Sequence, residues 1–132
     1  MVELLNKQEQ FSAGDDSIVI RKFLNGVEGG RALDITEYKT MAGTSVVPAG
    51  TIIVAKGKVY KPLALASATA YGTLQESHEY VGVTVATIDA SREGAGIMTA
   101  GSVNKDVMPF GGSGKVTDLK AAVPTLEFVT DL

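Results

Sequence analysis

The single histidine, His78, is the first residue to test for catalysis, because a hydrolytic triad needs a histidine beside a serine and an acid. His78 lies within residues 75–79, a polar run that is typical of an exposed loop. We therefore expect a solvated surface histidine. An enzyme accessory domain with His78 near a pocket stays open as an alternative. A zinc site usually takes several histidine or cysteine ligands, and this chain has one histidine and no cysteine.

Two pairs of acids are candidates for proton transfer or for binding a hard cation. Asp89 and Glu93 flank a turn, but no apolar stretch that would raise a carboxyl pKa surrounds them, so we expect surface charges. Asp15 and Asp16 lack the spaced acids and the glycine of a calcium loop, so we expect a solvated pair in front of a strand. The sequence thus predicts no metal, no cofactor and no enzymatic activity.

The glycine-rich segment 109–115 comes close to two catalytic motifs and departs from both. A phosphate-binding P-loop would need Gly in place of Pro109 and Ser or Thr in place of Val116. The G-x-S-x-G nucleophile motif would need its second Gly in place of Lys115. We expect a flexible loop that carries no chemistry.

Three lysines, Lys56, Lys58 and Lys61, cluster within a few residues. Charged side chains of this kind keep a strand edge from pairing with other proteins, and this is the interpretation that we favour. A contact with an acidic partner is the alternative.

Composition excludes several classes of protein. The chain has 132 residues, a length that suits one domain, and no cysteine, which excludes disulfide crosslinks. A net charge of −3 gives no electrostatic reason to bind nucleic acid. No apolar run approaches the roughly 20 residues that a membrane span needs. The N-terminus lacks the basic and apolar regions of a signal peptide, so we expect synthesis in the cytoplasm.

The elements that position these residues are mostly short strands. The clearest prediction is a hairpin over 51–62, in which a β-branched run is followed by a turn at Lys56-Gly57 and a strand that ends at Pro62. Further strands are predicted at 17–24, 30–38, 80–88, 97–103 and 125–130. We also expect a turn over 25–30, a loop or weak helix over 63–71, and a helical turn at 119–122 with Thr117 or Asp118 as its N-cap.

These elements predict a mainly β fold, a small β-barrel or sandwich of short strands with one short C-terminal helix and an extended N-terminal arm. We place the arm at residues 1–29 and the β-rich domain at 30–132. The segment 17–24 either lies against a partner or forms an edge strand of the same domain. Gly82, Thr84 and Ala86 give one strand a face of small residues that fits against another backbone or subunit.

Six runs follow one another along the chain: GRALDI (30–35), VPAGTI (47–52), GKVYKP (57–62), YVGVT (80–84), IMTAGSV (97–103) and LKAAVPTLEFV (119–129). In this order they resemble the head decoration proteins of tailed bacteriophages, the lambda-D-like group. The resemblance covers roughly residues 30–129, and the first 29 residues form a longer leader than some members have.

The resemblance implies a structural protein that binds the outer surface of an expanded icosahedral phage capsid and stabilises it against internal DNA pressure. It implies a homotrimer, the major capsid protein as partner, and a place on the outside of the virion. An arm that adds a strand to a capsid sheet fits this role. The expected capsid contacts are Ile18, Ile20, Arg21 and Phe23. The alternative is a small β-rich carbohydrate- or peptide-binding module displayed on the virion.

Overall fold

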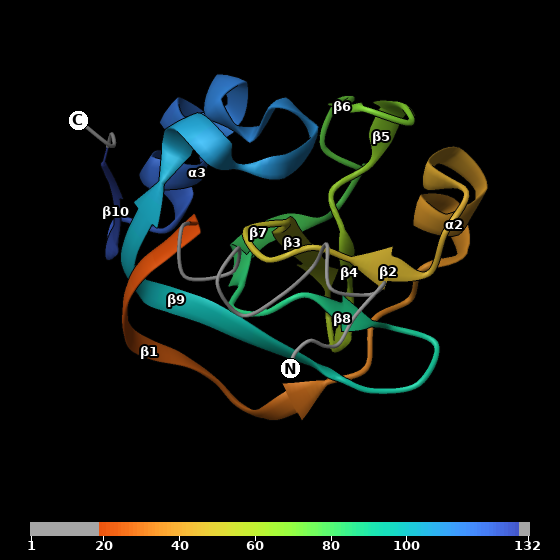
Figure 1. Cartoon of the computed structure of the whole chain (residues 1–132), viewed down its shortest axis with the longest axis horizontal. Coiled ribbons are helices and arrows are strands. Elements are labelled where there is room, and N and C mark those ends of the chain that lie inside the picture. The colour runs from red at the N-terminus through yellow and green to blue at the C-terminus, as the bar shows by residue number, and fades with distance from the viewer. Residues whose placement is uncertain (1–18, 130–132) are drawn as a thin grey trace, which may run out of the picture.

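The computed structural model describes residues 19–129, with 28–30 described by their backbone alone. Its central element is β9 (Ala95–Asn104). One side of β9 pairs antiparallel with β1 (Ile20–Arg31) along nearly its whole length. The other side is shared by β7 (Glu79–Thr84), which is antiparallel, and β10 (Leu126–Val129), which is parallel. Figure 1 shows β1 as the outermost strand beside β9.

The predicted central hairpin is confirmed. It consists of β3 (Ile52–Lys56) and β4 (Val59–Pro62), joined by a turn in which Gly57 has a φ of 63°. This left-handed conformation carries no steric penalty for glycine. β3 also pairs with β7, so the main sheet has the order β1-β9-β7-β3-β4, with β10 beside β9. The mainly β prediction with a short C-terminal helix is confirmed, but the described strands form open sheets and no closed barrel.

Two small ribbons lie beside the main sheet. β2 (Val46–Val47) pairs with β8 (Ile88–Asp89), and β5 (Leu65–Ser67) pairs with β6 (Ala70–Tyr71). The prediction of a loop or weak helix over 63–71 is therefore wrong. A tertiary contact explains the strand pairing, because the buried Tyr71 hydroxyl accepts a hydrogen bond from the Ile52 N–H, at 2.8 Å.

The prediction of a strand over 30–38 is wrong beyond Arg31, where β1 ends. Residues 36–38 belong instead to the helix α2 (Thr36–Ala42). The Asp34 carboxylate accepts the Thr36 N–H at 3.1 Å, which satisfies one of the unpaired donors at the start of the helix. Tyr38 is buried, and its hydroxyl donates to the Val46 carbonyl at 2.5 Å. These contacts favour a helix although the residues alternate as in a strand.

The segment predicted as a flexible loop is a 3₁₀-helical region, η3 (Pro109–Lys115), so that prediction is wrong. Phe110 fixes it, because its ring packs edge-on against Tyr38 and Tyr71 with centroid distances of 5.8 and 5.6 Å. Phe110 keeps this position with a φ of 59°, in the left-handed region that non-glycine residues seldom adopt.

The predicted C-terminal helical turn is α3 (Val116–Ala122). It begins three residues earlier than expected and no side chain caps it, so Thr117 and Asp118 lie inside the helix rather than at its N-cap. Its last turn is held by Lys120, whose ammonium group donates to the carbonyls of Pro124 and Leu126 at 2.8 and 2.7 Å. These bonds connect α3 directly to the start of β10.

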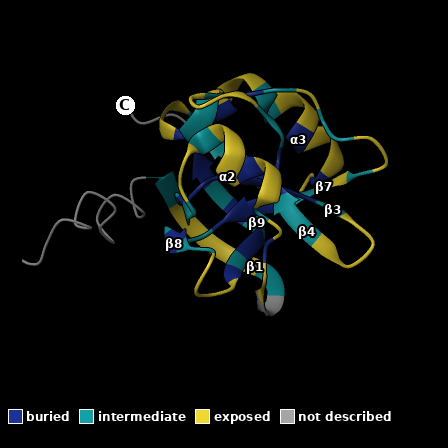
Figure 2. Cartoon of the chain, turned by 90° about the vertical axis from the view of Figure 1, so that its right-hand side faces the viewer, coloured by how far each residue is buried: buried dark blue, intermediate teal, exposed yellow. Residues whose placement is uncertain are grey.

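The main sheet is buried on both faces. Along β3, Ile52 and Val54 pack in one apolar cluster that includes Leu119 of α3 and Leu126 of β10. Ile53 packs in a second cluster with Tyr38 of α2. All three β3 side chains are fully buried, and each such burial stabilises the fold by roughly 1.5–3 kcal/mol. In Figure 2 the buried residues gather on the central strands, and the outward side of α2 is exposed.

The N-terminal part of the chain differs from the predicted arrangement. The turn expected over 25–30 is wrong, because β1 runs through it without interruption. Residues 20–24 form an edge strand of the same domain, which is the second of the two alternatives given above. The boundary drawn at 29/30 falls inside β1. Residues 1–18, which include Asp15 and Asp16 and most of the predicted arm, lie outside the described part of the chain.

Candidate binding surface along β1

The two ends of the main sheet differ in how their backbone groups are covered. At one end, Leu33 forms a bridge to Tyr60 of β4, and the Asp34 N–H donates to the Tyr60 carbonyl at 2.8 Å. At the other end, β1 pairs with β9 on its inner side, and no other described strand pairs with its outer side. Over residues 19–129, the outer side of β1 is therefore the edge of this sheet beside which another extended segment would pair.

Apolar side chains are exposed on the same strand. Phe23 and Leu24 are 55% and 62% exposed, the two largest values among the large apolar residues that the structure describes. The other described phenylalanine and tyrosine side chains are all buried or half-buried. Exposed apolar groups next to an open strand edge are typical of a surface that pairs with a partner.

β1 is an irregular strand. Its pairing with β9 shifts register at four places, between Ile20 and Lys22, between Phe23 and Asn25, between Asn25 and Gly26, and between Val27 and Arg31. Such irregularities increase local twist and interrupt the ladder, which limits unspecific pairing between copies of a flat edge. Leu24 itself lies at the second of these shifts, between the paired residues Phe23 and Asn25.

The four predicted contact residues have different environments. Ile18 lies outside the described residues. Ile20 is half-buried and packs against the core of its own domain, so much of its side chain is already covered. Arg21 and Phe23 are exposed on β1. The sequence reasoning missed Leu24, although it stands next to Phe23 in the same apolar run.

His78 lies in a turn and is half-buried. Its Nδ1 lies 2.8 Å from the Glu76 carbonyl oxygen, and the intervening Ser77 has a φ of 65°. Among the described residues no group of three or more His, Cys, Asp or Glu side chains is placed to hold a metal ion.

The three clustered lysines separate in the structure. Lys56 and Lys58 are exposed around the β3–β4 turn, while Lys61 is half-buried. Lys61 lies near Asp34, whose carboxyl pKa is lowered chiefly by hydrogen bonds from Thr36, with a smaller contribution from the lysine charge.

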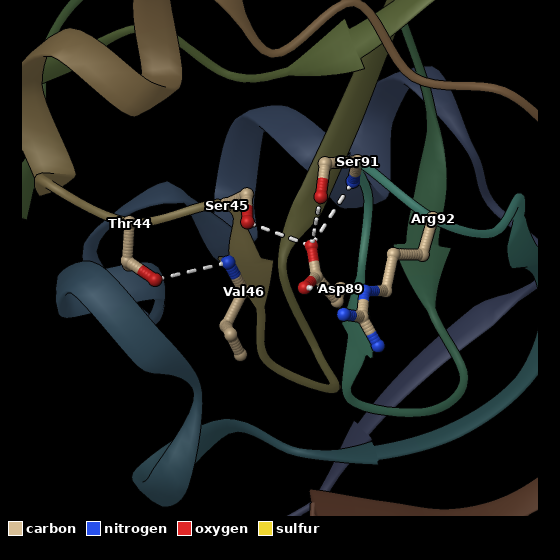
Figure 3. A network of polar contacts seen from close by, with 6 residues as sticks. All are labelled: Thr44, Ser45, Val46, Asp89, Ser91 and Arg92. Atoms are coloured by element: carbon tan, nitrogen blue, oxygen red, sulfur yellow. Dashed lines mark hydrogen bonds and ion pairs between the residues drawn. The ribbon is translucent and has the colours of Figure 1, made fainter.

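The Asp89 carboxylate accepts hydrogen bonds from Ser45 and Ser91, as Figure 3 shows. Its Oδ1 accepts from the Ser45 hydroxyl at 2.6 Å and from the Ser91 hydroxyl and N–H at 2.7 and 3.1 Å. The bond to Ser45 is the largest of the causes that lower its pKa to about 2. A carboxyl group that stays ionised is a poor proton donor. The hydrogen bond between Asp89 and Ser45 thus stabilises the pairing of β8 with β2. Glu93, the other acid of the predicted pair, is exposed.

An apolar hollow lies between α2 and η3. It has a volume of about 260 Å³, and its walls include Tyr38, Pro48, Pro109 and Phe110. Its mostly apolar lining suits an apolar side chain better than a sugar ring with many hydroxyl groups.

Comparison with known proteins leaves the resemblance untested, since no family model, no curated protein and no solved structure matches this sequence. Over residues 19–129, the helices are all too short or too polar to cross a membrane.

Proposed function

We propose that this protein is a structural component of a phage virion, which binds the outer surface of the expanded icosahedral capsid and stabilises it against the pressure of the packaged DNA. The proposal rests on the resemblance described above and on one structural observation, the outer edge of β1, which no described strand covers and beside which Phe23 and Leu24 are exposed. The partner is the major capsid protein. No enzymatic step, cofactor, nucleic acid or membrane takes part.

Binding at a sheet edge has a simple physical basis. An extended capsid segment beside β1 would receive backbone hydrogen bonds along its length, and Phe23 and Leu24 would lose their exposure to water. Fully burying one such side chain contributes roughly 1.5–3 kcal/mol. Residues 1–18 precede β1 and would extend the contact over the capsid surface.

A homotrimer would strengthen this contact. When three edges are joined in one particle, binding of the first raises the effective concentration of the other two at the capsid. A weak individual contact then suffices for stable attachment at the threefold positions of the lattice.

The test is co-sedimentation of the purified protein with DNA-filled heads that lack it, together with the stoichiometry at saturation. We expect saturable binding at a copy number that matches the threefold positions. In the variants Phe23→Ser and Leu24→Ser, affinity should fall by about tenfold each. Val59→Ser is the matched control, because Val59 is 50% exposed on β4 at the opposite end of the sheet. A folded protein that does not bind mature heads would refute the proposal.

The alternative, a displayed peptide-binding module, has the apolar hollow beside Phe110 in its favour. The carbohydrate version is less well supported, because Phe23 is the only exposed aromatic side chain among the described residues. Saturable binding of an apolar peptide that depends on Phe110, without binding to heads, would favour this alternative. Specific binding on a glycan array would favour the carbohydrate version.

A further inference from the structure

We propose that Asn25 is a site of spontaneous self-modification, at which the folded protein converts its own asparagine to aspartate and isoaspartate through a cyclic imide. The inference is independent of capsid binding. It starts from an exposed Asn25 followed directly by Gly26, in the middle of β1. Glycine has no side chain to hinder the attack of its backbone nitrogen on the preceding side chain.

The geometry brings the two reacting groups together. The Gly26 N–H donates a hydrogen bond to Oδ1 of Asn25 at 2.8 Å. The backbone nitrogen of Gly26 therefore already faces the side chain of the preceding residue. The carbonyl carbon Cγ is one bond from Oδ1 and therefore lies within about 4 Å of the Gly26 nitrogen. Productive attack requires an approach of roughly 3–3.5 Å, which a small rotation of the side chain provides.

The Asn25 side chain is exposed to solvent, in which it can rotate, and the strand is irregular at this point. Asn25 lies opposite Ala100 and Gly26 opposite Met98, so one residue of β9 has no partner between them. A second register shift separates Phe23 from Asn25. Gly26 has to remain glycine here, because a Cβ would overlap the Ile97 carbonyl oxygen.

The chemistry needs only water and base. Base removes the proton from the Gly26 nitrogen, which then forms a bond to Cγ of Asn25. The protonated base returns the proton to Nδ2, the bond between Cγ and Nδ2 breaks, and ammonia leaves. Water then opens the five-membered imide at one of its two carbonyl groups. One opening gives aspartate, and the other gives isoaspartate, in which the backbone runs through the former side chain. No atom is oxidised or reduced.

Either product changes the open edge. Aspartate adds a negative charge to β1 beside Phe23 and Leu24. Isoaspartate adds a methylene group to the backbone, which displaces residues 20–24 relative to β9, because the alternation of side chains depends on strict register. The modification therefore alters the strand segment that carries the exposed apolar residues.

The sequence contains its own controls, since its other two asparagines are Asn6 and Asn104, each followed by lysine. Asn104 is fully buried, and its Oδ1 accepts the Asp106 N–H at 3.1 Å, which fixes the side chain. Asn25→Gln is the matched variant, because it keeps the amide but would have to close a larger ring.

The experiment is to incubate the full-length protein in mildly alkaline buffer, digest it, and measure deamidation of each asparagine by mass spectrometry, with an enzymatic assay for isoaspartate. In the folded protein we expect Asn25 to be modified at least about tenfold faster than Asn104, and also faster than Asn6. In the variant Asn25→Gln we expect no modification at residue 25. The same incubation in urea measures the unfolded protein. If Asn25 stays intact in the folded protein and reacts only in urea, the proposal is overturned.

Discussion

Gly82 of β7 lies directly against the backbone carbonyl of Met98 in β9, so closely that a Cβ atom at residue 82 would overlap the carbonyl oxygen. This contact joins the two strands at the centre of the main sheet, where both core clusters meet. The small-residue face predicted for this strand therefore lies, at Gly82, against a backbone of the same protein. Close backbone approach is a recurrent reason for glycine inside a strand.

Gly82→Ala should destabilise the protein by about 1–3 kcal/mol, because the added methyl group forces β7 and β9 apart in a packed sheet. Equilibrium denaturation in urea measures the change. The control is Gly114→Ala, since a Cβ at Gly114 would meet no atom within 4 Å. That variant should stay within about 0.5 kcal/mol of the parent. Equal stability of the two variants would contradict the close approach of β7 and β9.

Asp89 should make stability depend on pH in the acid range. Its pKa falls from the ordinary value of 3.8 to about 2 in the folded protein, mainly through the Ser45 hydrogen bond. The folded state therefore favours the ionised form, and the resulting stabilisation is fully present above about pH 4 and lost as the pH falls towards 2.

Asp89→Asn tests this pH dependence, because the amide oxygen can still accept hydrogen bonds but carries no charge. In denaturation experiments across this range, the difference in unfolding free energy between parent and variant should shrink as the pH falls. Glu93→Gln removes a negative charge from an exposed side chain in the same turn and should not reproduce the effect. A difference that is constant with pH would show that the charge of Asp89 does not contribute.

Phe110 should be important for the order of η3. Phe110→Ala removes the ring that packs against Tyr38 and Tyr71 but keeps a side chain in the left-handed conformation, so we expect a loss of about 2 kcal/mol. Phe110→Gly removes the same contacts and relieves the backbone strain, which is worth about 1–2 kcal/mol. Thermal unfolding should show Phe110→Gly to be no less stable than Phe110→Ala. The reverse order would mean that residue 110 does not need a positive φ.

Two deletions should separate capsid binding from folding. Removal of residues 1–18 leaves β1 intact, and we expect a folded protein with weakened binding to heads. Removal of residues 1–29 takes away nearly all of β1 and leaves one side of β9 unpaired, so we expect loss of cooperative unfolding. Circular dichroism and co-sedimentation measure the two properties. Normal saturation of heads by the 1–18 deletion would exclude a binding role for the segment before β1.

The sequence alone predicted the elements whose structure depends on neighbouring residues. The β3–β4 hairpin follows from a β-branched run, a glycine at the turn and Pro62 at the end, and all of these act over a few residues. The strands around Val83 and Met98 and the short helix at Leu119 were predicted from local patterns in the same way. The mainly β class followed from these local signals.

The tertiary structure decided what depends on contacts between distant residues. Tyr38 lies in a helix because its side chain reaches Val46 and Phe110, although its neighbours alternate as in a strand. β1 is part of the sheet because β9, about seventy residues later, offers a partner for most of its residues. The candidate surface has the same origin, because the exposure of Phe23 and Leu24 follows from the position of β1 at the end of the sheet. Strand order is set by long-range pairing and burial, which a local sequence pattern does not encode.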